Sequence, residues 1–173
     1  MHILEVKYDE FLPDYISRID EEINKKIKAH IKIDTGMNRI GINSGCASAF
    51  IKKVLEMECI DLKGIFTHFA DVENKEIFNR QINEFKNVVD EFRDEFKKRD
   101  VKIHCLNSAG IFVHSDFSYD MVRMGIIMWG LTPFENNNSI MEKMLPVMGL
   151  KARITNIHTL KKGDGISYGH TFV

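Results

Sequence analysis

The stretch HIKIDTGMNRIG, residues 30–41, decides the fold that we expect for this chain. Ile31 and Ile33 alternate with polar residues, which is the period of a strand with two different faces. A glycine then ends the strand, and Arg39 follows within the turn. Parallel strands in α/β proteins present their ligand-binding groups at their carboxyl ends. The stretch therefore predicts that Arg39 lies at a ligand site, although an ordinary βα loop with a surface arginine has the same pattern.

Helices and strands alternate along most of the chain. Hydrophobic periods predict helices over 12–27, 49–57 and 75–99, and strands over 29–34, 60–66 and 101–106. The longest helix carries its apolar residues at steps of four and three, namely Phe78, Ile82, Phe85, Val89, Phe92 and Phe96. This seam also fits a coiled coil, but the strands on both sides favour packing against a sheet. The alternation is typical of parallel βαβ units, so we expect the α/β fold class.

The pattern changes after about residue 146. Residues 150–155 alternate apolar and polar side chains as a strand does, and KGDG at 162–165 predicts a turn. No helical period follows, and the polar run ENNNS at 135–139 lies just before the change. We therefore expect a boundary between residues 135 and 145, followed by the opening of a β domain.

The composition excludes several classes of protein. A net charge of −1 and a pI near 6.7 give no electrostatic basis for binding nucleic acid or an anionic membrane. No apolar run approaches the ~20 residues that span a bilayer, and the N-terminus MHILEVKYDE has no apolar signal-peptide core. Three cysteines without CxxC spacing indicate neither a disulfide framework nor a zinc site, and the histidines show no metal-ligand spacing. We expect a cytoplasmic protein with buried, reduced thiols.

Polar groups gather after the predicted strands and in the glycine-punctuated stretch that follows them. The candidates are Thr67 and His68, Asn107 and Ser108, and Arg123 with the backbone N–H groups at Gly125 and Ile126. Delivery of such groups by several strands to one face is typical of a barrel active site, and a serine hydroxyl beside glycine N–H groups suits a phosphate. Each group also has a plain structural interpretation, as a core histidine, a helix cap or a solvent-facing arginine. The motifs of dinucleotide and nucleotide sites, zinc proteases and hydrolase elbows do not occur.

Five ordered blocks of the sequence carry a family resemblance. They are KIDTGMNRIG (32–41), THFADVE (67–73), LNSAG (106–110), VRMGIIMWGLTP (122–133) and GDGISYGHTF (163–172). In order and spacing they resemble the alanine racemase family, from about residue 28 to the end of the chain. The resemblance implies a pyridoxal-phosphate enzyme that acts on alanine. It also implies a (β/α)8 barrel followed by a β domain, and a head-to-tail homodimer.

The resemblance implies roles around the ring of the cofactor. Arg39 matches the family's arginine that contacts the phenolic oxygen and orients the substrate, and Lys32 matches a lysine that is carbamylated in some members. Arg123 matches the arginine that faces the pyridine nitrogen, and His68 matches the histidine that hydrogen-bonds that arginine. Tyr168, in the SYG motif, matches the catalytic tyrosine, which serves the active site of the partner subunit as one of two opposed bases.

The resemblance also implies a phosphate site. Ser108 and the backbone N–H groups of Gly125 and Ile126 match the family's phosphate cradle, and Asn107 adjoins it. No metal is implied.

The cofactor lysine of the family stands on its first barrel strand, in a motif resembling AVxKAxAYGHG, and these 173 residues hold no such block. Lys7, in LEVKYDEF, lacks the surrounding pattern. The matching blocks predict the second half of a (β/α)8 barrel over residues 1–140 and the beginning of the C-terminal β domain over residues 141–173. Such a fragment or split subunit leaves sheet edges open, which invites complementation by an N-terminal half or aggregation. We therefore expect either a complementing N-terminal half or the homodimer that the resemblance implies. Alone, we expect weak binding of pyridoxal phosphate and no racemase activity.

Our leading hypothesis is an alanine racemase fragment, or split subunit, of the pathway that supplies D-alanine to the cell wall. Three other interpretations stay open. A serine racemase of the same fold shares these blocks, since the regions that select the substrate side chain lie elsewhere. A non-catalytic partner that binds the cofactor or assists assembly keeps them too, and a generic (β/α) binding domain would carry them by coincidence.

Overall fold

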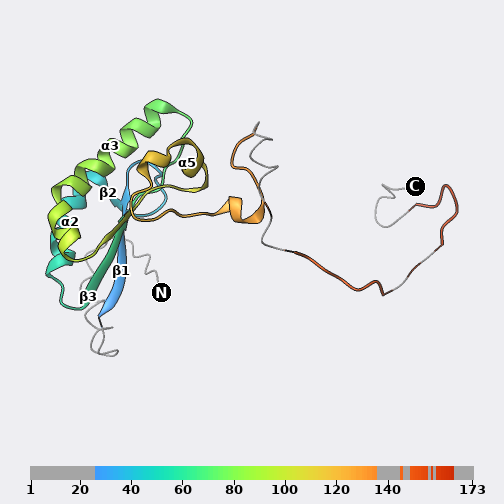
Figure 1. The fold of residues 1–173 in the computed structure, drawn as a ribbon, viewed down its shortest axis with the longest axis horizontal. Helices are drawn as coiled ribbons and strands as arrows, with labels where there is room; N and C mark the ends of the chain where they lie inside the picture. Colours follow the sequence, from blue (N-terminus) through green and yellow to red (C-terminus); the bar gives the residue numbers. More distant parts are fainter. Residues whose placement is uncertain (1–25, 136–144, 146–148, 156, 158, 166–173) are drawn as a thin grey trace.

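The computed structural model describes residues 26–135, 145, 149–155, 157 and 159–165. Its centre is a four-stranded parallel sheet in the order β2-β1-β3-β4 (Figure 1). The strands are β1 (Ile27–Asp34), β2 (Ile42–Asn43), β3 (Ile60–Phe66) and β4 (Lys102–His104). β1 and β3 form the longest pairing, from Ile27 beside Ile60 to Lys32 beside Phe66. Because the strands run parallel, their carboxyl ends lie at one edge of the sheet.

Helices cover one face of this sheet. They are α2 (Ser44–Glu56), α3 (Lys75–Glu91), α4 (Arg93–Lys98) and α5 (Ser108–Val113), with 3-10 turns η1 (Ser115–Phe117) and η2 (Ile126–Trp129) after them. α2 and α3 lie side by side across the face (Figure 1). The chain thus forms successive β-α-β units on a parallel sheet, which confirms the predicted α/β class. This is the arrangement of part of a TIM-type (β/α)8 barrel.

The strands follow their predicted positions with three differences. β3 has the predicted bounds, whereas β1 begins at Ile27 and β4 is shorter than the predicted 101–106. Periodicity does not predict β2, because two residues are too few for a period to show. Beyond β4, the N–H groups of Asp120 and Arg123 donate to the carbonyls of Ile103 and Leu106, each at 3.0 Å. Residues 120–123 therefore run beside β4 in the same direction.

The apolar seam of residues 78–96 is buried in one core with the sheet. Phe85 is 0% exposed and Phe96 is 1% exposed, in the same cluster as Ile33 and Ile65 of the strands. The coiled-coil alternative is therefore wrong, because the seam packs on the chain's own sheet.

The predicted helix over 75–99 is divided. At Phe92 the backbone has φ −110° and ψ 12°, which ends α3 and begins α4. The side chain of Phe92 stays buried, and its ring centroid lies 5.7 Å from that of Phe96. Burial of both rings holds the two helices on the core despite the interruption, which periodicity alone does not reveal.

Asparagines begin three of the helices. Oδ1 of Asn43, Asn74 and Asn107 accepts from the N–H groups of Gly45 (2.9 Å), Glu76 and Ile77 (3.1 and 3.2 Å), and Gly110 (2.9 Å). These bonds satisfy backbone donors that have no partner within a helix. The helix-cap interpretation is therefore correct for Asn107.

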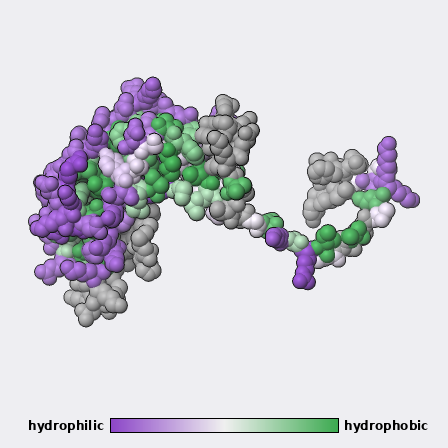
Figure 2. Space-filling model, in the orientation of Figure 1, coloured by the Kyte–Doolittle hydropathy of each residue, from purple (hydrophilic) through white to green (hydrophobic). Residues whose placement is uncertain are grey.

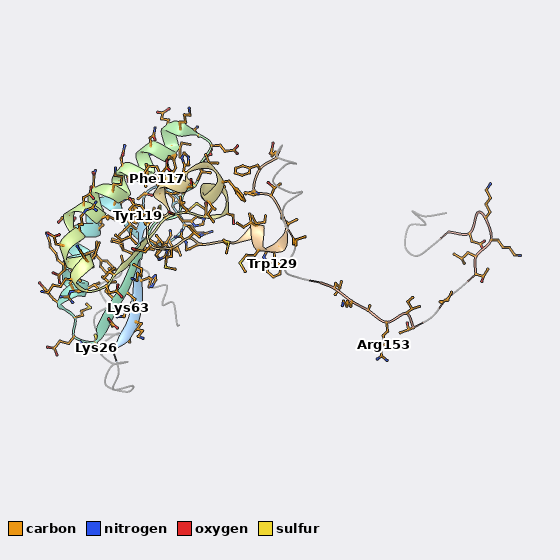
Figure 3. All side chains as sticks on the ribbon, viewed as in Figure 1. Lys26, Lys63, Phe117, Tyr119, Trp129 and Arg153 are labelled. Carbon is orange, nitrogen blue, oxygen red and sulfur yellow. The ribbon has the colours of Figure 1, made fainter. Side chains whose placement is uncertain are left out.

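Beyond Trp129 the described chain leaves the sheet (Figures 1 and 3). Residues 149–155 form no strand, and Leu150 and Ile154 are 97% and 81% exposed. The predicted strand over 150–155 is therefore wrong, because alternation supplies two faces but a strand also needs a paired neighbour. The turn that follows is as predicted: the N–H of Asp164 donates to the carbonyl of Lys161 at 3.0 Å.

Several expectations fall outside the described residues, namely most of the helix over 12–27, most of the boundary at 135–145, and Tyr168. None of the described helices is long and apolar enough to cross a membrane. None of the three cysteines forms a disulfide; Cys59 and Cys105 are buried as expected, whereas Cys46 is exposed. Cys46 departs from the expectation because α2 carries its buried side chains at Ala47, Ile51 and Val54, on another side of the helix.

Candidate active site

The carboxyl ends of β1, β3 and β4 bring together the polar residues that follow each strand. Thr35 and Thr67, the first residues after β1 and β3, are hydrogen-bonded hydroxyl to hydroxyl at 2.8 Å and are 3% and 0% exposed. Lys26 and Lys63 lie toward the opposite end of these strands (Figure 3). The candidate site is therefore built on a buried edge of the sheet.

The loop after β1 is shaped by its own residues. Oδ1 of Asp34 accepts from the N–H groups of Gly36 at 3.0 Å and Asn38 at 3.1 Å, and Asn38 has a φ of 54°. A Cβ at Gly41 would lie 2.9 Å from the carbonyl oxygen of Lys32, so this close return of the loop requires glycine. The loop holds Arg39 exposed but close enough for its charge to lower the pKa of His68.

Arg123 is the centre of the site. Its Nη2 donates to the carbonyls of Thr67 at 2.7 Å and Cys105 at 3.3 Å, and lies 3.4 Å from Nδ1 of His68. Its Nη1 lies 2.8 Å from Nδ1 of His104. The side chain is therefore held by residues after β3 and on and after β4, and the interpretation of Arg123 as a solvent-facing charge is wrong.

Ser108 and Gly125 also meet, 17 positions apart in sequence. The N–H of Gly125 donates to Oγ of Ser108 at 2.8 Å, and Ser108 is 7% exposed. The neighbouring Asn107 caps α5 and donates from Nδ2 to the carbonyl of Phe69 at 3.2 Å. Two members of the predicted phosphate cradle thus lie together, and Asn107 ties the start of α5 to the end of the β3 loop. Ile126 follows in η2, with its side chain exposed.

The electrostatics of the site favour neutral histidines among cations. Burial, and then the charges of Arg123, Arg39 and Lys32, lower the pKa of His68 to about 4. Burial, and then Arg123, lower the pKa of His104 to about 3. Lys32 donates from Nζ to the carbonyl of Ile40, at the base of the same loop. Positive charge thus surrounds the site, which suits an anionic ligand.

Sequence reasoning missed two residues here, His30 and His104. The Nδ1 of His30 lies 3.0 Å from Nε2 of His104, which in turn contacts Arg123. The two histidines lie on strands that are not neighbours, so their contact can be predicted only once the order and register of the strands are known. The one signal available was their position on predicted strands. Among the described residues no cluster of three or more His, Cys, Asp or Glu side chains could hold a metal.

The residues present fit pyridoxal phosphate. Oγ of Ser108 accepts from the N–H of Gly125 at 2.8 Å, and its own O–H can donate to a phosphate oxygen. Within the described part of the chain, the Nε–H and one Nη1 hydrogen of Arg123 have no hydrogen-bond acceptor. A phosphate group and a ring nitrogen are acceptors of the kinds that these two sets of donors bind.

Comparison with known proteins identifies relatives over most of the chain. The family model described as alanine racemase, N-terminal domain, matches residues 7–133. The chain is 38% identical over 160 residues to the alanine racemase of Methanococcus maripaludis, covering 91% of this chain and 43% of that protein. It is 39% identical over 163 residues to the alanine racemase of Halothermothrix orenii, covering 91% and 42%.

Solved structures give the same result. The alanine racemase of Clostridium difficile 630 superposes with a TM-score of 0.73 and 34% identity, over 95% of this chain and 43% of that one. The alanine racemase of Bacillus anthracis with bound L-Ala-P superposes with a TM-score of 0.60 and 28% identity, over 98% and 44%. The chain thus spans about two-fifths of the length of the relatives it matches. The matches in sequence and in fold agree, and this chain belongs to the alanine racemase family.

Proposed function

We propose that this chain forms the cofactor-facing part of an alanine racemase, which interconverts L- and D-alanine with pyridoxal phosphate for peptidoglycan precursors in the cytoplasm. The observation that carries the proposal is the setting of Arg123, which is fixed by carbonyls and imidazoles while two of its hydrogens stay available. Its place after β4, beside the Ser108–Gly125 pair, suits a phosphorylated pyridine ring.

Arg123 determines how the ring is used. When bound, the cofactor supplies a ring that withdraws electrons from an attached amino acid, which acidifies its α-proton. The pKa of an arginine side chain is about 12 or above, so Arg123 is protonated at neutral pH. It would donate a hydrogen bond to a neutral ring nitrogen and would not keep that nitrogen protonated. Electron withdrawal from the attached amino acid would then be moderate. We expect side reactions such as transamination to be suppressed, and Arg123→Glu in the active enzyme to raise transamination relative to racemisation.

The remaining residues have complementary roles in the proposal. Ser108, with the backbone N–H groups of Gly125 and Ile126, binds the phosphate, and Asn107 fixes the start of the helix that carries Ser108. Arg39 would contact the phenolic oxygen of the cofactor and help to orient the substrate, and we propose carbamylation of Lys32, which would hold Arg39, as an optional modification. Tyr168 returns or removes the proton on one face, in the active site of a partner subunit of a head-to-tail homodimer.

Binding of pyridoxal phosphate to the purified chain is the first test. We expect Ser108→Ala to weaken the affinity about tenfold, because a hydrogen bond to a charged group is lost. Ser115→Ala is the matched control, since Ser115 is an exposed serine in η1. Titration followed by absorbance or by equilibrium dialysis measures both. Equal affinity in the two variants would contradict the assignment of the phosphate site.

Racemisation is the second test. The chain holds no block like the family's cofactor-lysine motif. We therefore expect the chain alone to form D-alanine no faster than free cofactor. Co-expression with the part of the Methanococcus maripaludis relative that precedes the matched region should restore turnover of L-alanine. L-serine is assayed beside L-alanine, because faster turnover of L-serine would favour a serine racemase. Cofactor binding without turnover in that mixture would favour the second candidate, a non-catalytic partner, which the missing lysine block supports.

A further inference from the structure

Arg123 ends a line of three side chains that crosses the sheet. Its Nη1 lies 2.8 Å from Nδ1 of His104 on β4, and Nε2 of His104 lies 3.0 Å from Nδ1 of His30 on β1. His104 is 3% exposed, and its ring stacks on Phe66 with centroids 4.9 Å apart and planes 6° apart. The guanidinium also packs on Phe66, at 4.9 Å from the ring centroid. His104 is thus buried against β3, whereas His30 and Arg123 at the two ends of the line are half-buried.

The chemistry of the three groups gives this line a direction. A guanidinium only donates hydrogen bonds, so Nδ1 of His104 must be the unprotonated acceptor. The proton of neutral His104 is then on Nε2, which donates to Nδ1 of His30, and the proton of His30 is on its own Nε2. Protonated His104 would place an N–H against the guanidinium N–H groups and a second positive charge beside the first. The line therefore runs from Arg123 through His104 to His30, with both imidazoles neutral.

Gly64 makes the meeting of the two histidines sterically allowed. It lies on β3 directly beside His30, and β3 separates β1 from β4. A Cβ at Gly64 would lie 2.5 Å from both Nδ1 and Cε1 of His30, closer than real side-chain contacts. Any side chain at this position would push the imidazole away from His104. Glycine is required here by the approach of the ring, not by the backbone conformation.

We propose that His104 and His30 are positioning residues which fix the guanidinium of Arg123 in one orientation. We also propose that this arrangement requires glycine at position 64, because the ring of His30 occupies the space of a Cβ there. The inference deepens the proposed function and rests on it, since Arg123 there faces the ring nitrogen. A fixed guanidinium presents its remaining donors to the ligand without reorganisation, which is how a preorganised site gains affinity. His30 acts through His104 and does not touch the ligand.

The tautomers test the proposal without any cofactor. In the full chain labelled with 15N-histidine, two-bond 1H–15N correlation spectra at pH 7 distinguish which ring nitrogen carries the proton. We expect both His104 and His30 to be neutral with the proton on Nε2, with signals assigned from His30→Gln and His104→Gln. A proton on Nδ1 of either ring, or a charged ring, would overturn the proposal.

Gly64→Ala tests whether His30 needs the space above Gly64. Gly149→Ala is its matched control, because a Cβ at Gly149 meets nothing within 4 Å. We expect the Nη protons of Arg123 to give separate signals in the parent chain and in the control, and averaged signals in Gly64→Ala. Pyridoxal phosphate affinity should fall about tenfold in Gly64→Ala alone. Unchanged Arg123 signals and unchanged affinity in Gly64→Ala would overturn the proposal.

If Gly64→Ala does not fold, two substitutions of His30 test the proposal instead. His30→Gln keeps an acceptor and should keep separate Arg123 signals, whereas His30→Leu should average them; the same signals in both would overturn the proposal. The two proposals fail separately. The expected tautomers without any cofactor binding support the line and count against the proposed function, and cofactor binding with other tautomers overturns only the line.

Discussion

Arg123 is a cation without an ion pair among the described residues. Burial lowers its pKa, and the carbonyls of Thr67 and Cys105 compensate only part of the lost hydration. The imidazoles beside it contribute acceptors, not charge. A ligand atom with a lone pair, or a nearby phosphate, therefore stabilises this residue more than water does in a half-buried site.

The cysteines give a prediction at the same scale. Cys46 is exposed, whereas Cys59 and Cys105 are 9% and 0% exposed, and burial raises the pKa of Cys105 to about 12. Because the thiolate is the reactive form, Ellman's reagent should modify Cys46 rapidly in the native chain and Cys105 only after denaturation. Cys46→Ser should abolish the rapid phase. A rapid phase that persists in Cys46→Ser would show that a thiol taken as buried is accessible.

The sequence predicted part of the site and not the rest, for a physical reason. Arg123 and His68, and Ser108 and Gly125, were predicted as pairs, and the structure brings each pair together. Their family roles remain proposals. His30 escaped prediction because a histidine within a strand looks like any polar member of an alternating pattern. Its partner becomes visible only once the sheet order is known, and Tyr168 lies outside the described residues.

At the scale of the element, the cap of α3 is a measurable part of the fold. Oδ1 of Asn74 accepts from two N–H groups, those of Glu76 and Ile77. Asn74→Ala should lower the free energy of unfolding by about 1 kcal/mol, measured by urea denaturation. Asn79→Ala is the control, because Asn79 is exposed inside the same helix and alanine is the better helix former. A smaller loss in Asn74→Ala than in Asn79→Ala would contradict the cap.

Helices and strands were predicted where the periodicity of one hydrophobic face determines the conformation. They were missed where contacts with another part of the fold determine it. β3 and the seam of α3 follow directly from their periods, since each buries one face on the other. The break at Phe92 depends on where the core lies under the helix, and β2 depends on the return of the loop at Gly41. Residues 150–155 alternate as a strand does but have no paired strand in the described structure.

At the scale of the whole molecule, apolar side chains gather where the described chain leaves the sheet. Five of them are between 43% and 55% exposed, namely Met124, Ile126, Met128, Trp129 and Leu131. Figure 2 shows apolar colour along this part, next to the polar surface over the helices. Monomeric proteins seldom leave such a stretch uncovered. This exposure agrees with the proposal that a second subunit or a complementing segment packs on these side chains.

The three histidines around Arg123 give the molecule a pH dependence with a definite sign. Burial lowers the pKa of His30, and the pKa values of His68 and His104 fall to about 4 and about 3. Native imidazoles thus stay neutral where unfolded ones, with a pKa of about 6.5, bind protons. The free energy of unfolding therefore has its full value above pH 6.5. It falls as the pH is lowered toward 4, by at most about 1.4 kcal/mol per pH unit for each histidine.

The charges facing these rings do not reverse the sign. His68 faces Arg123 after β4, Arg39 in the loop after β1, and Lys32 on β1, and His104 faces Arg123 and His30. Each of the three cations disfavours protonation of a ring beside it.

Urea denaturation between pH 4.5 and 7.5 measures how steeply the free energy of unfolding changes with pH. His104→Gln keeps an acceptor and a donor but removes one titrating group, so its free energy of unfolding should fall less steeply with decreasing pH. His114→Gln is the control, because His114 contacts the carbonyl of Val72, away from Arg123. Stability that stays constant from pH 6.5 to 4.5, or equal slopes in the two variants, would mean that these imidazoles take up protons in the native state. The line from Arg123 through His104 to His30 would then be lost as the pH falls below about 6.5.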